Sequence, residues 1–129
     1  MSGRKFTYII ITGSSGDNHK FDNIKDLKVN VENGLLDLHL DDGSFVFMFD
    51  GLRYFEVGLP VQQGVDVRFQ SCEVRLTSVG KGVEETISIS EVINCEWKAD
   101  QGLFMVFCKS RTFAFHLDHV ISYFLKNQV

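Results

Sequence analysis

The feature that most constrains this chain is an alternation of apolar and polar residues with a period of two, which recurs along most of its length. In residues 27–32 and 36–41, every second side chain is Leu or Val and the residues between them are polar or charged. Because successive side chains of a strand point to opposite faces, this pattern predicts antiparallel sheets with one buried and one wet surface. Asn33-Gly34 and Asp42-Gly43 are hairpin turn signals that join three such strands.

The same pattern predicts about seven or eight strands in all. Residues 50–64 interrupt the alternation and are expected to form a surface loop. At the end of the chain, Asp118 is suited to be an N-cap, and apolar residues recur after it at helical spacing. We therefore expect a mainly β protein with one C-terminal amphipathic helix.

The chain also resembles itself at an offset of 68 residues, where residues 33–55 align with 101–123 without a gap. One hypothesis is a duplicated strand-strand-strand-helix unit, with pseudo-repeats 24–56 and 92–124 inside a single domain of residues 1–129. The alternative is that hairpins built from turn glycines and inward-facing phenylalanines look alike without duplication. The identical pairs are Gly34/Gly102, Leu35/Leu103, Phe45/Phe113, Phe47/Phe115 and Asp50/Asp118.

An order of antiparallel strands followed by one amphipathic helix resembles the pleckstrin-homology-like arrangement, in which a bent sheet is closed at one end by that helix. The resemblance is one of architecture. The basic lipid-headgroup loop of that family has no counterpart in this sequence, so phosphoinositide binding is not carried over. A β-sandwich is the competing expectation.

Composition excludes several classes of protein. The 129 residues contain 13 basic and 17 acidic side chains and a single proline, which is typical of one folded domain and not of a duplex nucleic-acid or anionic-membrane binder. We find no signal-peptide core and no apolar run of membrane-spanning length, so a cytoplasmic location is expected. Three widely spaced cysteines predict reduced core thiols, without a disulfide framework or zinc site.

Residues 9–16 resemble the strand-to-loop opening of a nucleotide or phosphate site. Complete glycine motifs are absent, and no amphipathic helix follows, so a turn between strands is the simpler interpretation. The ligand-binding hypothesis assigns a local anion nest to Ser14, Ser15, Gly16 and Lys20.

Two groups of histidines are candidates for acid–base chemistry. His39 lies between Asp37 and Asp41 on one face of a predicted strand, where a solvated polar face is the alternative. His116 and His119 flank the predicted helix start and could converge. Neither group carries a recognisable catalytic motif, so we assign no catalytic residue, metal site or cofactor, and a small hydrolase is only an alternative function.

Apolar residues concentrate in the predicted loop, where they either fold onto the core or form a contact surface. We expect a protein interface there, at Leu52, Tyr54, Phe55 and Leu59. The favoured function is a non-enzymatic, inhibitor-type interaction protein that binds a protein partner or self-associates. Its profile is similar to that of immunity proteins and phage-encoded antagonists of host defence; a small-ligand or nucleotide binder is the other alternative.

Overall fold

The computed structural model describes residues 6–13, 17–22, 24–30, 33–48, 51–61, 63–77 and 84–128. This part of the chain forms eleven strands and two short 3-10 turns, Ala99–Gln101 and Leu117–His119, and contains no α-helix. The prediction of a mainly antiparallel β protein is confirmed. The strands are β1 (Tyr8–Gly13), β2 (Asn18–Phe21), β3 (Ile24–Asn30), β4 (Leu35–Leu40), β5 (Ser44–Met48), β6 (Leu52–Gly58), β7 (Phe69–Leu76), β8 (Glu85–Lys98), β9 (Leu103–Cys108), β10 (Arg111–His116) and β11 (Val120–Asn127).

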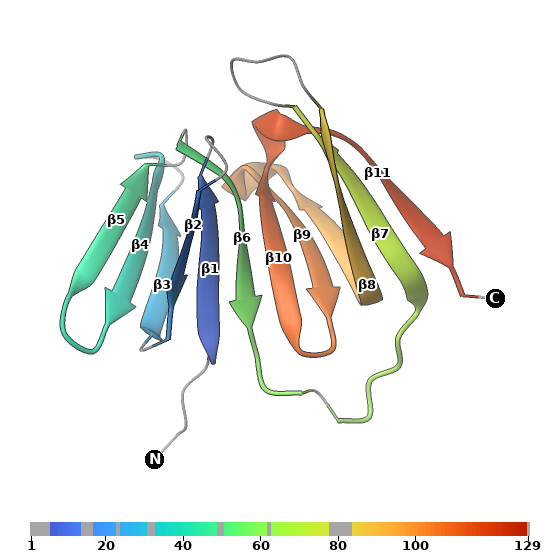
Figure 1. The fold of residues 1–129 in the computed structure, drawn as a ribbon, viewed down its shortest axis with the longest axis horizontal. Helices are drawn as coiled ribbons and strands as arrows, with labels where there is room; N and C mark the ends of the chain where they lie inside the picture. Colours follow the sequence, from blue (N-terminus) through green and yellow to red (C-terminus); the bar gives the residue numbers. More distant parts are fainter. Residues whose placement is uncertain are drawn as a thin grey trace.

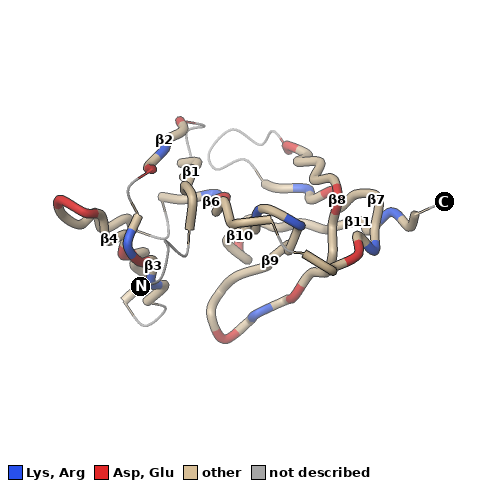
Figure 2. Tube along the Cα trace, turned by 90° about the horizontal axis from the view of Figure 1, so that it is seen from below, with Lys and Arg blue, Asp and Glu red and all other residues tan. Residues whose placement is uncertain are grey.

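Two sheets contain these strands. Eight strands pair in the order β11-β7-β8-β9-β10-β6-β1-β2, and three pair in the order β3-β4-β5. Viewed along its shortest axis, the molecule is a row of strands with β5 at one end and β11 at the other (Figure 1). Seen from below, β1 and β2 lie on one side of the molecule and β3 and β4 on the other, so this end has two layers (Figure 2).

The core has two parts. Between the three-stranded sheet and the strands around β6 lies one cluster, in which Ile9, Leu36, Leu38 and Phe55 are buried. The second cluster lies on the other face of β10 and is centred on Phe104, Phe113 and Phe115, with buried residues from β7 and β8 around them. Because β6, β9 and β10 contribute to both clusters or lie between them, these strands are apolar on both faces.

The long strand β8 allows the large sheet to curl. Glu91 has a φ of 58°, and the register with β9 shifts between Val92 and Asn94, so the first part of β8 pairs with β7 and the second with β9. Across this bend, the ring of Tyr123 on β11 stacks on Phe104 of β9 with centroids 4.4 Å apart, although two strands separate them in the sheet order.

The predicted C-terminal helix is wrong, because residues 120–127 form strand β11. A bulge after Val120 places this residue and Leu125 on the same, partly buried side, which imitates helical spacing. Four of the five apolar residues of β11 are β-branched or aromatic, and such residues favour strands. Asp118 is not a helix cap; its backbone N–H donates to Nδ1 of His116 in a 3-10 turn. The feature on which the pleckstrin-homology resemblance depended is therefore absent from residues 84–128.

The predicted surface loop at residues 50–64 is also wrong in its first part. Residues 52–58 form β6, which lies between β1 and β10 in the middle of the large sheet. Leu52, Phe55 and Val57 are buried there. Since this strand is covered on both faces, it lacks the period-two signal by which the other strands were found.

The pairing pattern of the three-stranded sheet recurs around β8, β9 and β10, each position lying 68 residues further along. Both sets have the same bulge in their first strand, the same left-handed glycine before the second strand, and the same hairpin register. The matched positions are Ile24 and Val92 at the bulge, Gly34 and Gly102 with φ of 66° and 65°, and the pairs Leu35–Met48 and Leu103–His116.

The remaining strands match too, β2 and β6 at the same offset of 68 and β1 at an offset of 63. β1, β2 and β6 have the pairing pattern of β7, the first part of β8, and β11. We call residues 8–58 the first half of the chain and residues 69–127 the second half. The fourth element of the recurring pattern is a strand in both halves, not the helix expected. Ile9 pairs with Phe21 and Val57, Cys72 pairs with Ile89 and Leu125, and the bulge at Arg53 returns at Ile121.

Candidate functional site

The candidate anion nest is only partly described. Ser14, Ser15 and Gly16 lie outside the described residues, and Lys20 is on β2. The Lys20 ammonium lies 3.9 Å from the Asp22 carboxylate and 5.5 Å from the centre of the Tyr8 ring. The segment joins two paired strands, and the nearby carboxylates oppose an anion. Ligand binding at this loop stays a prediction.

The histidines of the second group do converge. The rings of His116 and His119 have centroids 4.9 Å apart. Nδ1 of His116 accepts the backbone N–H of Asp118 at 3.1 Å, so in this arrangement Nε2 is the ring nitrogen that carries hydrogen. This bond gives His116 a structural role in the turn before β11. In the first group, Nδ1 of His39 lies 3.1 Å from the Ser44 hydroxyl, across the hairpin of β4 and β5.

The three cysteines lie in or beside the second core cluster. Cys72, Cys95 and Cys108 are free, and all belong to or pack against the second core cluster. Burial raises the pKa of Cys72 to about 12 and that of Cys108 to about 11. These two thiols are therefore protonated at neutral pH and are poor nucleophiles. Within the described ranges, no group of three or more His, Cys, Asp or Glu side chains could hold a metal ion.

A polar cluster that the sequence did not reveal joins three strands. The hydroxyl of Tyr8 on β1 donates to the carboxylate of Glu56 on β6, and the guanidinium of Arg111 on β10 lies 3.5 Å from the same oxygen. Burial and the Glu56 hydrogen bond raise the pKa of Tyr8 to about 12. A protonated phenol, a carboxylate and a cation satisfy one another here, so the cluster stabilises the junction of β1, β6 and β10.

Arg53 makes a second link between the halves. Its guanidinium pairs with the Glu85 carboxylate and donates to the Thr77 carbonyl oxygen at 3.5 Å, while its Nε has no partner among the described residues. These contacts join β6 to the second half of the chain. Because the Arg53 side chain is buried, loss of its charged partner would leave an uncompensated charge and lower the stability of the fold.

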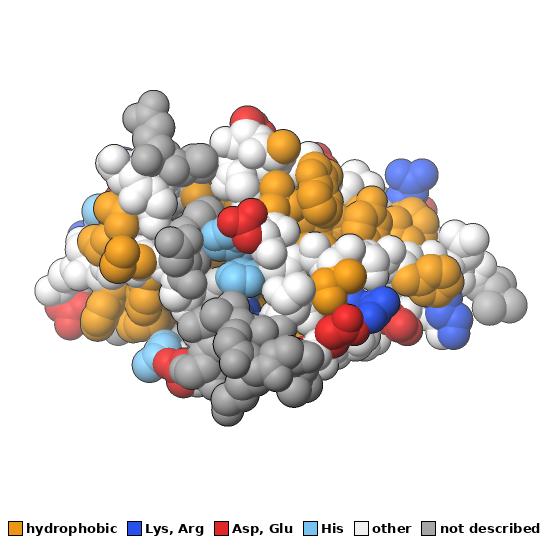
Figure 3. Space-filling model, turned by 90° about the horizontal axis from the view of Figure 1, so that it is seen from above, with side chains coloured by type: hydrophobic (Ala, Val, Ile, Leu, Met, Phe, Trp, Pro, Cys, Tyr) orange, Lys and Arg blue, Asp and Glu red, His pale blue; other side chains and the backbone are white. Residues whose placement is uncertain are grey.

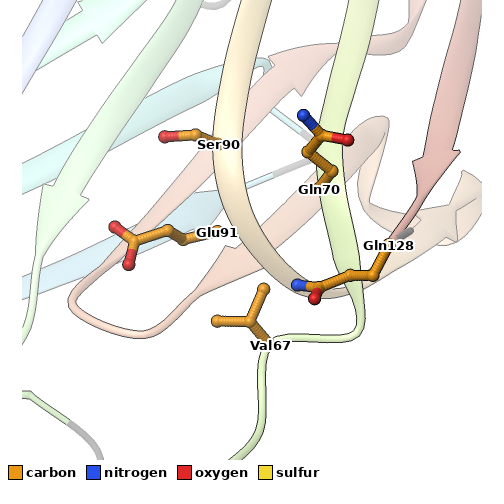
Figure 4. Close-up of a pocket in the computed structure, with 5 residues that line it drawn as sticks. All are labelled: Val67, Gln70, Ser90, Glu91 and Gln128. Atoms are coloured by element: carbon orange, nitrogen blue, oxygen red, sulfur yellow. The ribbon is translucent and has the colours of Figure 1, made fainter.

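Hollows on the surface are shallow or apolar. One of about 370 Å³ lies at the bend of β8 and is lined by Val67, Gln70, Ser90, Glu91 and Gln128, whose side chains do not converge on one point (Figure 4). Another, of about 430 Å³, separates β3 from β9, with Val29 and Leu103 among its lining residues. Neither hollow gathers a nucleophile, base and oxyanion donor in the way that hydrolysis requires.

The structure places the predicted interface residues mostly in the core. Leu52 and Phe55 are buried, so they offer almost no surface to a partner. Tyr54 is half-buried with its ring 5.1 Å from that of Phe115, and the backbone N–H of Leu59 donates to Ser110. Replacing Phe55 by Ala would open a cavity and not test an interface.

Exposed apolar side chains lie instead on the two outermost strands. Six of the eight large apolar residues that are exposed, within the described part of the chain, belong to β5 or β11. Figure 3 shows hydrophobic side chains at the surface toward both ends of the molecule. The six exposed residues on these strands are Phe45, Val46 and Met48 on β5, and Ile121, Tyr123 and Phe124 on β11.

Both strands also have one unpaired edge. β5 pairs only with β4, and β11 pairs only with β7, in the part of the chain that the structure describes. An unpaired edge presents a row of backbone N–H and C=O groups that can accept another strand. Together, the open backbone and the apolar side chains make β5 and β11 the candidate functional surfaces, which we call the β5 edge and the β11 edge.

The sequence contained a signal for these edges that was read differently. Residues 44–48 belong to the third strand of the predicted meander, which was not expected to be a binding edge, and residues 120–127 were assigned to a helix. Comparison of the chain with protein-family models, with curated proteins and with solved structures finds no match. Among the described residues, no helix is long and apolar enough to cross a membrane.

Proposed function

We propose that this protein is a non-enzymatic interaction protein that binds another protein chain by strand addition at the β5 and β11 edges. The observation that carries the proposal is the coincidence of unpaired backbone with exposed apolar side chains on both strands. In strand addition, backbone hydrogen bonds supply affinity and alternate side chains supply specificity. Natural proteins usually protect such edges with charge, proline or bulges, and residues 44–48 have no charged side chain or proline.

The chemistry of the described residues supports this class of function more than catalysis. Two cysteines are buried and protonated, one histidine is held by a backbone N–H, and the Tyr8–Glu56–Arg111 cluster satisfies itself. An inhibitor that occupies its target by strand addition fits these features, as does an assembly protein. Two alternatives are tested by alanine variants. If the protein binds a nucleotide at Lys20, Lys20→Ala should lose that binding, and if it is a hydrolase that uses His116, His116→Ala should lose that activity.

Capture from lysate of the source cells tests the proposal. Wild type is compared with Val46→Lys and Phe124→Lys, which place a charge at each edge, and with Val61→Lys, which places one at a similarly exposed apolar site away from both. We expect a protein that wild type and Val61→Lys retain and that an edge variant loses. Retention that is independent of both edges, or no retained protein, where a copy of this chain from the source cells counts as one, would refute the function.

A further inference from the structure

We propose that the chain bound at these edges is a second copy of this protein, docked head to tail, with β11 of one copy paired antiparallel to β5 of the next. The inference rests on the proposed function, because it names the partner that the edges bind. Its basis is the recurring pairing pattern, which already contains one junction of the same kind.

That junction lies inside the chain, where β6 of the first half pairs with β10 of the second half. By the offset of 68, β6 matches β11 and β10 matches β5. The second half therefore ends in β11, which is equivalent to β6, the strand that pairs with β10. One outer strand of the first half is β5, which is equivalent to β10. The β5 edge and the β11 edge are therefore the two sides of a junction that one chain can form only once.

Burial at matched positions supports the correspondence. Ala114 at the internal junction is 1% exposed, while Val46, which matches it on β5, is 57% exposed. Phe55 on β6 is 4% exposed, while Tyr123, which matches it on β11, is 42% exposed. The exposed apolar residues of β5 and β11 thus match residues that are buried where β6 pairs with β10. Pairing of β5 with β11 of another copy would remove these exposed side chains from water in the same way.

The internal register predicts the register between copies. Ala114 pairs with Phe55 across the internal junction, so Val46 of one copy would lie opposite Tyr123 of the next. In the same way, Phe113 pairs with Glu56, which places Phe45 opposite Phe124. Apolar and aromatic pairs of this kind stabilise antiparallel strands, and no like charges meet in residues 44–47 and 122–125.

The two edges cannot meet within one molecule, because β5 and β11 lie at opposite ends of its longest axis (Figure 1). Each bound copy would leave one edge of each kind free. A head-to-tail contact of this type grows into a ring if its rotation closes and into a filament if it does not.

The only tryptophan of the chain lies beside the proposed contact. Trp97 on β8 is 53% exposed and matches Val29 on β3, one of the residues that face Leu103 across the apolar hollow between the halves. In the assembly, Trp97 would occupy the equivalent place beside Leu35 of the next copy. Its fluorescence should therefore move to shorter wavelength as copies associate.

Native mass of the purified protein, measured by light scattering and sedimentation over a range of concentrations, tests the inference. We expect wild type and Val61→Lys to form assemblies larger than a dimer, with the Trp97 shift, and Val46→Lys and Phe124→Lys each to be monomeric. Both edge positions are exposed in one copy, so circular dichroism of the variants should match that of wild type. An equimolar mixture of the two edge variants should form a dimer only, because one intact β11 edge then meets one intact β5 edge.

Three results would overturn head-to-tail pairing: a monomeric wild type at every concentration, a dimer that each edge variant retains by itself, or a mixture that stays monomeric. If wild type is monomeric but captures another protein in an edge-dependent way, only the identity of the partner is wrong. If neither capture nor assembly depends on the edges, the proposed function fails as well.

Discussion

Replacing one phenylalanine in each half by alanine tests whether two matched positions differ in burial, and therefore in their contribution to the free energy of unfolding. Phe113 on β10 and Phe45 on β5 are matched, and their side chains are 6% and 49% exposed. Truncating a buried phenylalanine to alanine costs about 3–5 kcal/mol, because transfer free energy is lost and a cavity remains. For Phe45, about half of the ring is already in water and no enclosed cavity forms, so we expect a loss of about 1 kcal/mol.

The two losses are measured as free energies of unfolding in urea. Both substitutions are made in the Phe124→Lys background, which places a charge at the β11 edge on an exposed side chain, so that association does not add to the stability of either variant. The Phe45 ring lies 5.9 Å from that of Phe47 and 5.1 Å from that of Phe21, and the Phe113 ring lies 6.2 Å from that of Phe115, so a smaller loss at Phe45 would not come from fewer ring contacts. Equal losses for the two variants, or a larger loss for Phe45→Ala, would refute the assignment of β5 as a free edge.

Two further predictions concern the interior. A Cβ at Gly58 would lie 2.0 Å from Cε2 of Tyr8, so Gly58→Ala should lower the unfolding free energy by about 1–3 kcal/mol, whereas Gly43→Ala, which meets no atom within 4 Å, should change the thermal midpoint little. Burial raises the pKa values of Cys72 and Cys108 from 9.0 to about 12 and about 11, so the unfolded chain loses these protons first. The unfolding free energy should therefore be unaffected by these thiols below pH 9 and fall as pH rises from about 9 to 11; a flat profile in urea titrations over that interval would contradict the burial of both thiols.

Period-two alternation was sufficient to predict the class of fold, because one face of most strands is wet. It failed where a strand is covered on both faces. Leu52, Phe55 and Val57 on β6 are buried on one side, and Tyr54 and Glu56 contact neighbouring strands on the other. Without a solvent-facing side, this strand looks like an apolar loop, and an interface was predicted in what is the centre of the sheet.

Bulges explain the other failure. An extra residue at Ile121 changes which side chains of β11 face the core, so the apolar residues no longer alternate. A helix fits such spacing equally well by sequence alone. The matching bulge at Arg53 in β6 has the same effect, and both strands were the ones misassigned.

The offset of 68 residues was visible in the sequence from five identities, but what it means for binding was not. Four of the identities lie in or directly before the hairpins of β4–β5 and β9–β10, whereas β6, which forms the other side of the junction, shares no identical residue with its equivalent β11. Glu56 and Phe124 lie outside the aligned residues, so only the pairing register shows that these two positions correspond. The candidate site could therefore not be predicted before strand pairing was known.

Disulfide cross-linking between copies tests the central claim most directly. In the Val46→Cys/Tyr123→Cys variant, the two thiols would face each other across the β5–β11 junction at a separation that suits a disulfide. We expect mild oxidation to give a ladder of covalent multimers on a non-reducing gel. The control Val46→Cys/Phe124→Cys places the second thiol on the opposite face of β11 and should give none. Equal cross-linking of both variants, or none in either, would contradict head-to-tail pairing in the internal register.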